Sequence, residues 1–300
     1  MSSFFPAFTF QRMLGRREFE ISEMAMTLYL STLDSGDPPF IAIPVFPIRV
    51  FRHAAIYVRA DGSVREPKDL IGRKVGEFFF YGHDAGLWAK GALEDEYGVR
   101  HDAYSYAIGG VSRPFGPQEW VPSRPPDRVK LEHIGTARTL DAMLEAGEID
   151  AIMAPVTPPS MLMGENKVKR LFDDCEAVER AYYRKTGIFP IMHTLVIRRD
   201  VYRQNPWVAQ ALYTAFKEAK HVALERYKEG MAISHTTFMM PWMTPHQQRI
   251  EALMADDWWP YGVAANRKVI DTFARYHHEQ GLSNRRYAVE ELFAPETLGD

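Results

Sequence analysis

The sequence predicts a bilobed α/β protein whose two lobes are joined by two crossover strands. Short β-branched or aromatic runs alternate with segments of helical periodicity along most of the 300 residues. Two apolar extended runs, Ala54–Arg59 and Ile191–Arg198, bracket a middle α/β block. One lobe is then built from both ends of the chain, residues 1–60 and 191–300, and the other from residues 61–190. In such a layout a ligand lies between the lobes, near strand ends and loops.

Composition places the chain among globular proteins with no strong preference for a charged partner. Hydrophobic residues make up 46% of the sequence, and 36 basic residues are mixed with 39 acidic ones. We therefore expect neither a nucleic acid nor a membrane as partner. The N-terminal segment has no basic region followed by an apolar one, and no run approaches the roughly 18 apolar residues of a membrane span. The expected location is the cytoplasm, and the sequence leaves open whether the chain forms a homo-oligomer.

The first half of the chain predicts alternating elements because apolar runs are separated by breakers such as Gly36-Asp37-Pro38-Pro39. A helix is expected to end within Thr9–Arg17, and a second one covers residues 24–33. Buried strands are expected at Phe19–Met24, Ile41–Phe46, Ala54–Arg59, Lys74–Phe80 and Tyr104–Gly110. The helix Leu87–Tyr97 follows the fourth of them.

The second half repeats the α/β rhythm and then becomes helical. Val111–Arg128 is rich in proline, which predicts an irregular surface excursion. Strands are expected at Ile149–Ala154 and Ile191–Arg198. Helices are expected at Thr139–Ala146, Ala177–Lys185, Asn205–Lys228 and Ala265–His277. Asn205 and Pro206 are typical of a helix start.

Three cationic or titratable side chains lie in the link between two expected strands. Arg49, Arg52 and His53 occur within five residues and are walled by Ile, Val and Phe. Guanidinium groups match carboxylates with paired donors, so both arginines are candidates for binding an anion. Surface or hinge salt bridges are the alternative. Histidine titrates near neutrality, so His53 could transfer a proton, or it could be a hydrogen-bonded core histidine.

Loops that follow strands of the second lobe offer further candidate contacts. Tyr81–Gly86 opens a helix, so its backbone N–H groups lie where an anion could sit, although such loops are often plain connectors. His83 and the neighbouring Asp84 could line this lobe. Glycine pairs and hydroxyls after strands could approach a ligand. The candidate ligand contacts of this lobe are His83, Gly109, Gly110, Thr157 and Ser160.

The single cysteine and the tryptophan pair have structural explanations. Cys175 excludes an intramolecular disulfide, and its acidic setting would raise the pKa of the thiol, which argues against a nucleophile. Trp258 and Trp259 could cap the cleft, but aromatic clusters more often lie in a core or a subunit interface.

Several runs along the chain from Phe8 onward resemble the 4,5-dihydroxyphthalate decarboxylase family. They are FRHAAIYV, LIGRKVG, MLEAGEIDAIMAP, YYRKTGIFPIMHTLVIRRDVY, DWWPYGVAANR and EELFAPETL. The most specific part is TGIFPIMHT at Thr186–Thr194. The resemblance implies a fold like the type II periplasmic solute-binding proteins. It also implies cofactor-independent decarboxylation of an aromatic dicarboxylic acid, most directly 4,5-dihydroxyphthalate to protocatechuate and CO2, a step of phthalate degradation.

The resemblance gives His193, within the TGIFPIMHT run, a catalytic role and strengthens that of His53. Pairing of the two expected crossover strands would bring both rings to the cleft floor. Glu23 and Tyr29, in the run SEMAMTLY, are candidates for a general base or a contact with a phenol, although Glu23 could instead be an acid at a helix N-terminus. No HxxxH or clustered carboxylate spacing supports a metal site, so neither a metal nor a cofactor is expected.

Two departures from the family pattern bear on these expectations. In the family a first strand with an Asp-Tyr-Asp loop precedes what is here Thr9, so we expect a chain that is short at its N-terminus, with one wall of the first lobe missing. The run EFFFYGHDAGLWAKG differs from the family's usual run, which bears on substrate choice. Two rival interpretations are a solute-binding module that binds a small aromatic or carboxylate ligand without turnover, and a partner-dependent fragment without activity of its own.

Overall fold

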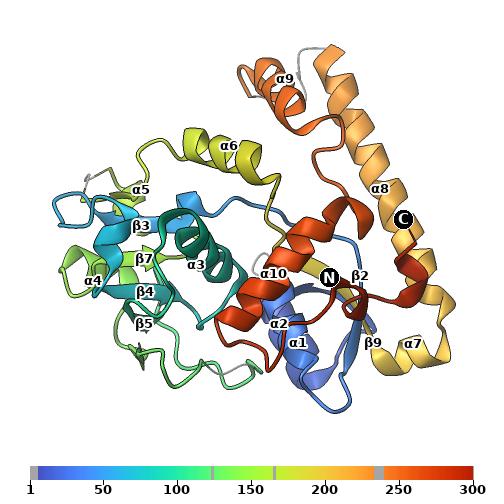
Figure 1. Ribbon diagram of the computed structural model, residues 1–300, viewed down its shortest axis with the longest axis horizontal. Coiled ribbons are helices and arrows are strands. Elements are labelled where there is room, and N and C mark those ends of the chain that lie inside the picture. Colours follow the sequence, from blue (N-terminus) through green and yellow to red (C-terminus); the bar gives the residue numbers. More distant parts are fainter. Residues whose placement is uncertain (1–5, 123–124, 165–166, 233–239, 300) are drawn as a thin grey trace.

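The computed structural model describes residues 6–122, 125–164, 167–232 and 240–299. The chain folds into two α/β lobes, each built around one β-sheet (Figure 1). The sheet of the first lobe has the strand order β1-β9-β2, and the sheet of the second lobe has the order β6-β5-β4-β7-β3-β8. The bilobed α/β architecture expected from the sequence is therefore present.

The first lobe combines segments from both ends of the chain. Its strands are β1 (Ile21–Ala25), β2 (Phe40–Ile43) and β9 (His193–Arg198). The central strand β9 pairs antiparallel with both neighbours, which places Glu23 directly opposite Leu195. The helices of the N- and C-terminal segments are α1 (Pro6–Arg16), α2 (Met26–Thr32), α7 (Arg199–Gln204), α8 (Trp207–Ala232), α9 (Met243–Met254) and α10 (Arg267–Glu279), with 3₁₀ turns η4 (Ala264–Asn266), η5 (Val289–Glu291) and η6 (Pro295–Thr297).

The second lobe is formed by the continuous middle of the chain. Strands β4 to β7 run parallel, and β3 pairs antiparallel with β7 and β8. The strands are β3 (Ile56–Arg59), β4 (Lys74–Phe78), β5 (Ser105–Gly109), β6 (Leu131–His133), β7 (Ala151–Met153) and β8 (Val168–Arg170). The helices are α3 (Asp84–Tyr97), α4 (Leu140–Glu145), α5 (Pro159–Leu162) and α6 (Cys175–Thr186), with 3₁₀ turns η1 (His53–Ala55) and η2 (Pro67–Leu70).

The hinge differs from the expected pair of crossover strands. Residues 54–59 were expected to pair with 191–198, but β3 belongs to the second sheet and β9 to the first. The two connections meet just before these strands, where an isolated bridge joins Arg49 to Ile191. The prediction of paired hinge strands is wrong because a 3₁₀ turn at His53–Ala55 ends the crossing before β3 begins. The sheet of the second lobe thus starts at Ile56 rather than after residue 60.

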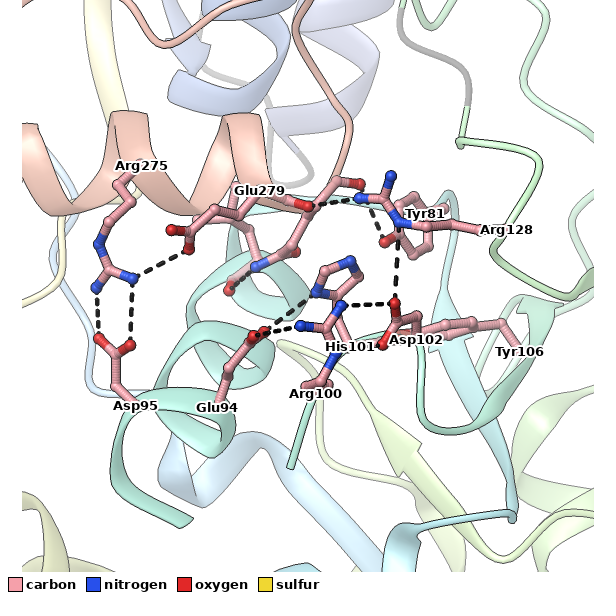
Figure 2. A network of polar contacts seen from close by, with 12 residues as sticks. Tyr81, Glu94, Asp95, Arg100, His101, Asp102, Tyr106, Arg128, Arg275 and Glu279 are labelled. Atoms are coloured by element: carbon pink, nitrogen blue, oxygen red, sulfur yellow. Dashed lines mark hydrogen bonds and ion pairs between the residues drawn. The ribbon is translucent and has the colours of Figure 1, made fainter. Parts of the chain in front are cut away.

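Helix α10 packs against α2 of the first lobe and α3 of the second. A Cβ on Gly91 would lie 2.2 Å from the ring of Tyr276, so the missing side chain lets α3 and α10 approach closely. Figure 2 shows the polar rim of this contact, where Arg275 of α10 forms ion pairs with Asp95 of α3 and with Glu279. The hydrophobic core is continuous across the contact and contains residues of both lobes. Among the described residues, no helix is long and apolar enough to cross a membrane.

Candidate active site

His193 is the first residue of β9 and lies where the two lobes meet. Its ring packs edge-on against Phe10 of α1, with ring centroids 5.1 Å apart. Its Nδ1 lies 2.5 Å from Glu23 Oε1, and its Nε2 lies 3.8 Å from Asp84 Oδ2. One imidazole is therefore flanked by two carboxylates, one from each lobe.

The pairing of β1 with β9 explains the contact between Glu23 and His193. In an antiparallel pair, residues directly opposite and diagonal to one another share a face of the sheet. Glu23 is opposite Leu195 and hence diagonal to His193. The Glu23 side chain keeps 33% of its surface exposed, whereas that of His193 keeps 14%. Glu23 thus joins the Nδ1 side of the ring to solvent.

Asp84 brings the second lobe to the same ring. It is the first residue of α3, and its Oδ1 accepts the backbone N–H of Thr27 at 2.9 Å. Thr27 lies in the first turn of α2, whose N-cap residue Ala25 makes no side-chain cap, so Asp84 caps a helix of the other lobe. Burial raises the pKa of Asp84 to about 6, although His193, Thr27 and Arg52 act to lower it.

Arg52 is a cation whose charge acts on this cluster, since it lowers the pKa of Asp84. It precedes η1 and is half-buried, and its Nε lies 3.2 Å from the sulfur of Met192. Burial lowers the pKa of Arg52 to about 10, and the charge of Asp84 is the largest influence in the opposite direction. Within the described residues, no protein carboxylate or carbonyl is hydrogen-bonded to its terminal nitrogens, so this guanidinium retains donors for an anionic ligand.

Arg49 does not occupy such a position. Its guanidinium is buried and donates to the carbonyl oxygens of Phe189 and Pro260 and to the side chain of Asn266. Burial lowers its pKa to about 9. Its terminal nitrogens thus bind the hinge link to Phe189 and to the segment of Pro260 and Asn266, contacts that do not support Arg49 as a carboxylate anchor, and that role stays an untested prediction.

His53 and His193 do not meet, in contrast to the expectation from the sequence. The ring of His53 packs between Phe172 and Tyr182 and lines a cavity of about 210 Å³ at α6 and the end of α3. Neither ring nitrogen has a protein partner among the described residues, and burial lowers the pKa of His53 to about 4. The 3₁₀ turn that carries His53 explains why a ring expected on a strand points elsewhere.

Tyr29 also differs from its expected role. Its side chain is fully buried, donates to the carbonyl of Leu292 at 2.6 Å and accepts the N–H of Ala42. Burial raises the pKa of its hydroxyl. Tyr29 therefore joins α2 to β2 and the C-terminal segment instead of facing a ligand.

The candidates of the second lobe are mostly engaged within the protein. His83 caps α3 by accepting the N–H of Gly86, and Ser160 donates to Asp141 at 2.5 Å. A Cβ on Gly109 would lie 2.4 Å from Ile134, and one on Gly110 would lie 1.6 Å from the carbonyl of Arg113, so both glycines serve packing. Thr157 lies 3.5 Å from the hydroxyl of Tyr57. In the described part of the chain, no hydrogen bond or ion pair joins these five candidates to His193.

Sequence reasoning missed Asp84 as a partner of His193 and Phe10 as its packing neighbour. The signal for Asp84 was present, since an acidic residue at the start of a helix after a central strand lies at the carboxyl end of the sheet. Nothing in the local sequence of Phe10 indicates its contact. Among the described residues, no group of three or more His, Cys, Asp or Glu side chains is placed to hold a metal ion.

Cys175 and the tryptophan pair lie away from the described contacts of His193. The Cys175 thiol donates to the carbonyl of Phe172, and burial raises its pKa. Trp259 donates to the carbonyl of Phe46 and packs on Phe189 at the hinge. Both tryptophans line cavities of about 540 and 480 Å³ beside α9.

Comparison with solved structures defines the class of protein to which this fold belongs. The sulfonate-binding protein SsuA of Methylobacillus flagellatus superimposes with a TM-score of 0.54 and 15% identity, over 97% of this chain and 77% of that one. The SsuA protein of Escherichia coli gives a TM-score of 0.51 and 14% identity, over 97% and 84%. The chain has the bilobed type II periplasmic-binding-protein-like fold.

Comparison with curated sequences gives the family. The 4,5-dihydroxyphthalate decarboxylase of Comamonas testosteroni is 36% identical over 293 residues, which are 98% of this chain and 87% of the relative. The enzyme of the same name from Pseudomonas putida is 31% identical over 60% of this chain and 69% of that relative. No family model matches the chain. The chain belongs to the 4,5-dihydroxyphthalate decarboxylase family.

Proposed function

We propose that this chain is a carbon-carbon lyase that converts 4,5-dihydroxyphthalate to protocatechuate and CO2, with His193 as the proton donor. The family supports the reaction, since both curated relatives carry this name. The observation that supports the proton donor is the placement of His193 between Glu23 and Asp84 at the junction of the lobes. An imidazole ring that carries a hydrogen on both nitrogens can give up a proton from one of them while the other stays bonded to its partner.

The reaction needs one proton and a substituent that donates electrons to the aromatic ring. It needs no oxidant and no reductant. When the bond between the ring and its carboxylate breaks, the electron pair stays on the ring carbon, and CO2 departs. That ring carbon takes a proton. The hydroxyl in the para position releases electrons into the ring when the carbon is protonated. Each carboxylate of 4,5-dihydroxyphthalate has a hydroxyl in the para position, and the two are equivalent by symmetry. Orientation in the site therefore decides which carboxylate leaves.

His193 can deliver this proton while Glu23 holds its ring. Nε2 of His193 is the nitrogen on the side of the second lobe, so we assign it the donation to the ring carbon. Glu23 holds the Nδ1 hydrogen and thereby fixes the orientation of the ring. After donation the free nitrogen of the ring is Nε2, so the next proton must reach the ring there. Glu23 is thus a positioning residue rather than a contact of the substrate phenol.

Arg52 is the proposed anchor for the carboxylate that stays. A guanidinium binds a carboxylate through two parallel hydrogen bonds, and Arg52 keeps its terminal nitrogens available in the described structure. Closure of the lobes around the ring would exclude water and weaken the solvation of the leaving carboxylate, which favours its conversion to neutral CO2. Arg49 and His53 have no role in this scheme because their described contacts lie elsewhere.

A turnover assay tests the proposal against the binding-module alternative. Purified protein is incubated with 4,5-dihydroxyphthalate, and CO2 and protocatechuate are measured in parallel, with phthalate as a control that lacks the electron-releasing hydroxyls. We expect both products in equal amounts from the first substrate and none from phthalate. Tight binding of both compounds without CO2 release would instead support a solute-binding module. The same assay with a chelator tests the expectation of a metal-free reaction, and a cytoplasmic location and a homo-oligomer stay predictions.

A further inference from the structure

Asp84 is a buried carboxylate at the junction of the lobes to which the proposed reaction gives no task. Only 7% of its side chain is exposed. Oδ1 is fixed by the N–H of Thr27 at 2.9 Å, and Oδ2 faces Nε2 of His193 at 3.8 Å. A carboxylate in this position is close to any group that His193 protonates.

The charged and polar groups around Asp84 come from several segments of the chain. His193 of β9 and Arg52 of the hinge link face it as cations or potential cations. The first turn of α2 contributes the backbone N–H of Thr27, and Glu23 of β1 adds a second negative charge behind His193. At the N-cap of the helix that carries Asp84, burial lowers the pKa of His83, while Glu77 acts to raise it. The cluster holds two carboxylates against one permanent cation and one imidazole.

Binding of a dianionic substrate adds two negative charges to a cluster that already holds two carboxylates. Proton donation requires the reacting carbon within about 3 Å of a histidine nitrogen, and Nε2 is only 3.8 Å from Asp84. The carboxylate on that carbon then lies a few ångströms from Asp84, and like charges at such a distance disfavour the ionised form of one of them. Asp84 is already easier to protonate than an exposed aspartate, because burial raises its pKa to about 6.

We infer that Asp84 takes up a proton from solvent when the dianionic substrate binds between the lobes and releases it once CO2 has left. This inference rests on the proposed function. A protonated Asp84 turns from a repelling charge into a hydrogen-bond donor toward the substrate carboxylate. Decarboxylation consumes one proton, given by His193, and leaves a product with one negative charge fewer. Asp84 then ionises again, so its proton is borrowed and not consumed.

Calorimetry with phthalate tests the inference without turnover, because phthalate carries both carboxylates but no hydroxyl. Binding is measured at pH 7 in buffers of different ionisation enthalpy, which gives the number of protons taken up. Asp84→Asn keeps an oxygen for the N–H of Thr27 but cannot be protonated. We expect the wild-type protein to take up about one proton more than this variant at pH 7. At pH 5 Asp84 is already protonated in the free protein, so the difference shrinks toward zero.

Asp34→Asn is the matched control. Asp34 also accepts one backbone N–H at 2.9 Å, from Asn284, but it lies beyond the other end of α2. Its variant should take up as many protons as the wild-type protein. Equal uptake by Asp84→Asn and the wild type at pH 7, or a difference between the two proteins that is the same at pH 5 and pH 7, overturns the inference. Failure of the wild type to bind phthalate also counts against it. Release of CO2 from 4,5-dihydroxyphthalate by the wild-type protein is scored separately, so the proposed function can stand when the inference falls.

Discussion

Arg49 and Arg52 lie three residues apart in the same link between the lobes, yet their surroundings differ. The Arg49 guanidinium donates to Phe189, Pro260 and Asn266, so its terminal donors are used inside the protein. Among the described contacts, the only hydrogen bond of the Arg52 guanidinium joins its Nε to the sulfur of Met192. The charge of Asp84 acts on this guanidinium. The first arginine fastens the hinge, whereas the second keeps its donors for a ligand.

The two histidines repeat this division. His53 is enclosed by aromatic rings, and its pKa is lowered to about 4, so it is neutral at pH 7, and neither of its ring nitrogens has a hydrogen-bond partner among the described residues. His193 lies between two carboxylates, with Glu23 2.5 Å from its Nδ1 and Asp84 3.8 Å from its Nε2. Function near this hinge therefore depends on which polar groups are left available, not on which residue types occur there. Five substitutions test this division between fastening and reacting groups.

His193→Ala should have the largest effect, because it removes the proposed proton donor and leaves the anchor in place. We expect kcat for CO2 release to fall by about 10³-fold, a typical contribution of general acid catalysis. Binding of phthalate, measured by calorimetry, should change little. Full activity in this variant would remove His193 from the mechanism.

Arg49→Met should lower stability the most of the five substitutions. It leaves buried carbonyl groups without donors, for which a loss of about 3 kcal/mol in the free energy of unfolding is expected. Urea denaturation measures this loss. If the variant is as stable as the wild type but binds phthalate poorly, Arg49 is an anchor after all.

Arg52→Met is the counterpart at the neighbouring arginine. Loss of a bidentate, charge-assisted pair should raise KM for 4,5-dihydroxyphthalate about 100-fold. The free energy of unfolding should change by less than about 1 kcal/mol, since the guanidinium makes few contacts within the protein. Steady-state kinetics and urea denaturation of both arginine variants together decide whether hinge and anchor functions are separate.

Glu23→Gln should have a moderate effect. The amide oxygen can still accept the Nδ1 hydrogen of His193, but the negative charge beside the ring is lost. We expect kcat to fall about 10-fold with KM nearly unchanged, as for other partners that orient a reacting group. A change confined to KM would instead place Glu23 in contact with the substrate.

His53→Leu should have the smallest effect on activity and a distinct effect on stability. The folded-state pKa of His53, about 4, lies below the ordinary value of 6.5, so the unfolded chain binds more protons between these values. Wild-type stability is therefore lost as pH falls below about 6.5, by about 2 kcal/mol at pH 5 from this group. The variant should lack this share of the loss in urea denaturation at pH 7 and pH 5. A large drop in kcat would return His53 to the catalytic residues.

Much of the fold could be predicted because strand and helix signals are local. The runs that become β1, β2, β4, β5, β7 and β9 are short, apolar and bounded by breakers, and each was expected within a few residues of its place. The hinge was misjudged because Ala54–Arg59 reads as one strand. In the structure the first residues of this run belong to the 3₁₀ turn His53–Ala55. The remaining residues form β3, which pairs with β7 and β8 in the sheet of the second lobe.

The site could be predicted only in part, since segments distant in sequence decide which side chains keep hydrogen-bonding groups free for a ligand. Glu23 and His193 were expected and are 2.5 Å apart. Arg49 and Arg52 could not be told apart, because the groups that occupy Arg49 include Pro260 and Asn266, more than 200 residues away in sequence. Asp84 is joined to Thr27 across 57 positions, a contact with no trace in either local run.

The position of β9 at the centre of the first sheet has a consequence for how the protein is made. Neither β1 nor β2 has another strand partner in the described sheet. Both strands can therefore pair only after β9, about 150 residues or more further along the chain, has been synthesised. The second lobe is continuous in sequence and can fold while the chain is still being synthesised. The sheet of the first lobe is complete only when Arg198 has emerged, and the same step brings His193 to Glu23. Assembly of the reactive centre is thereby tied to a long-range step of folding.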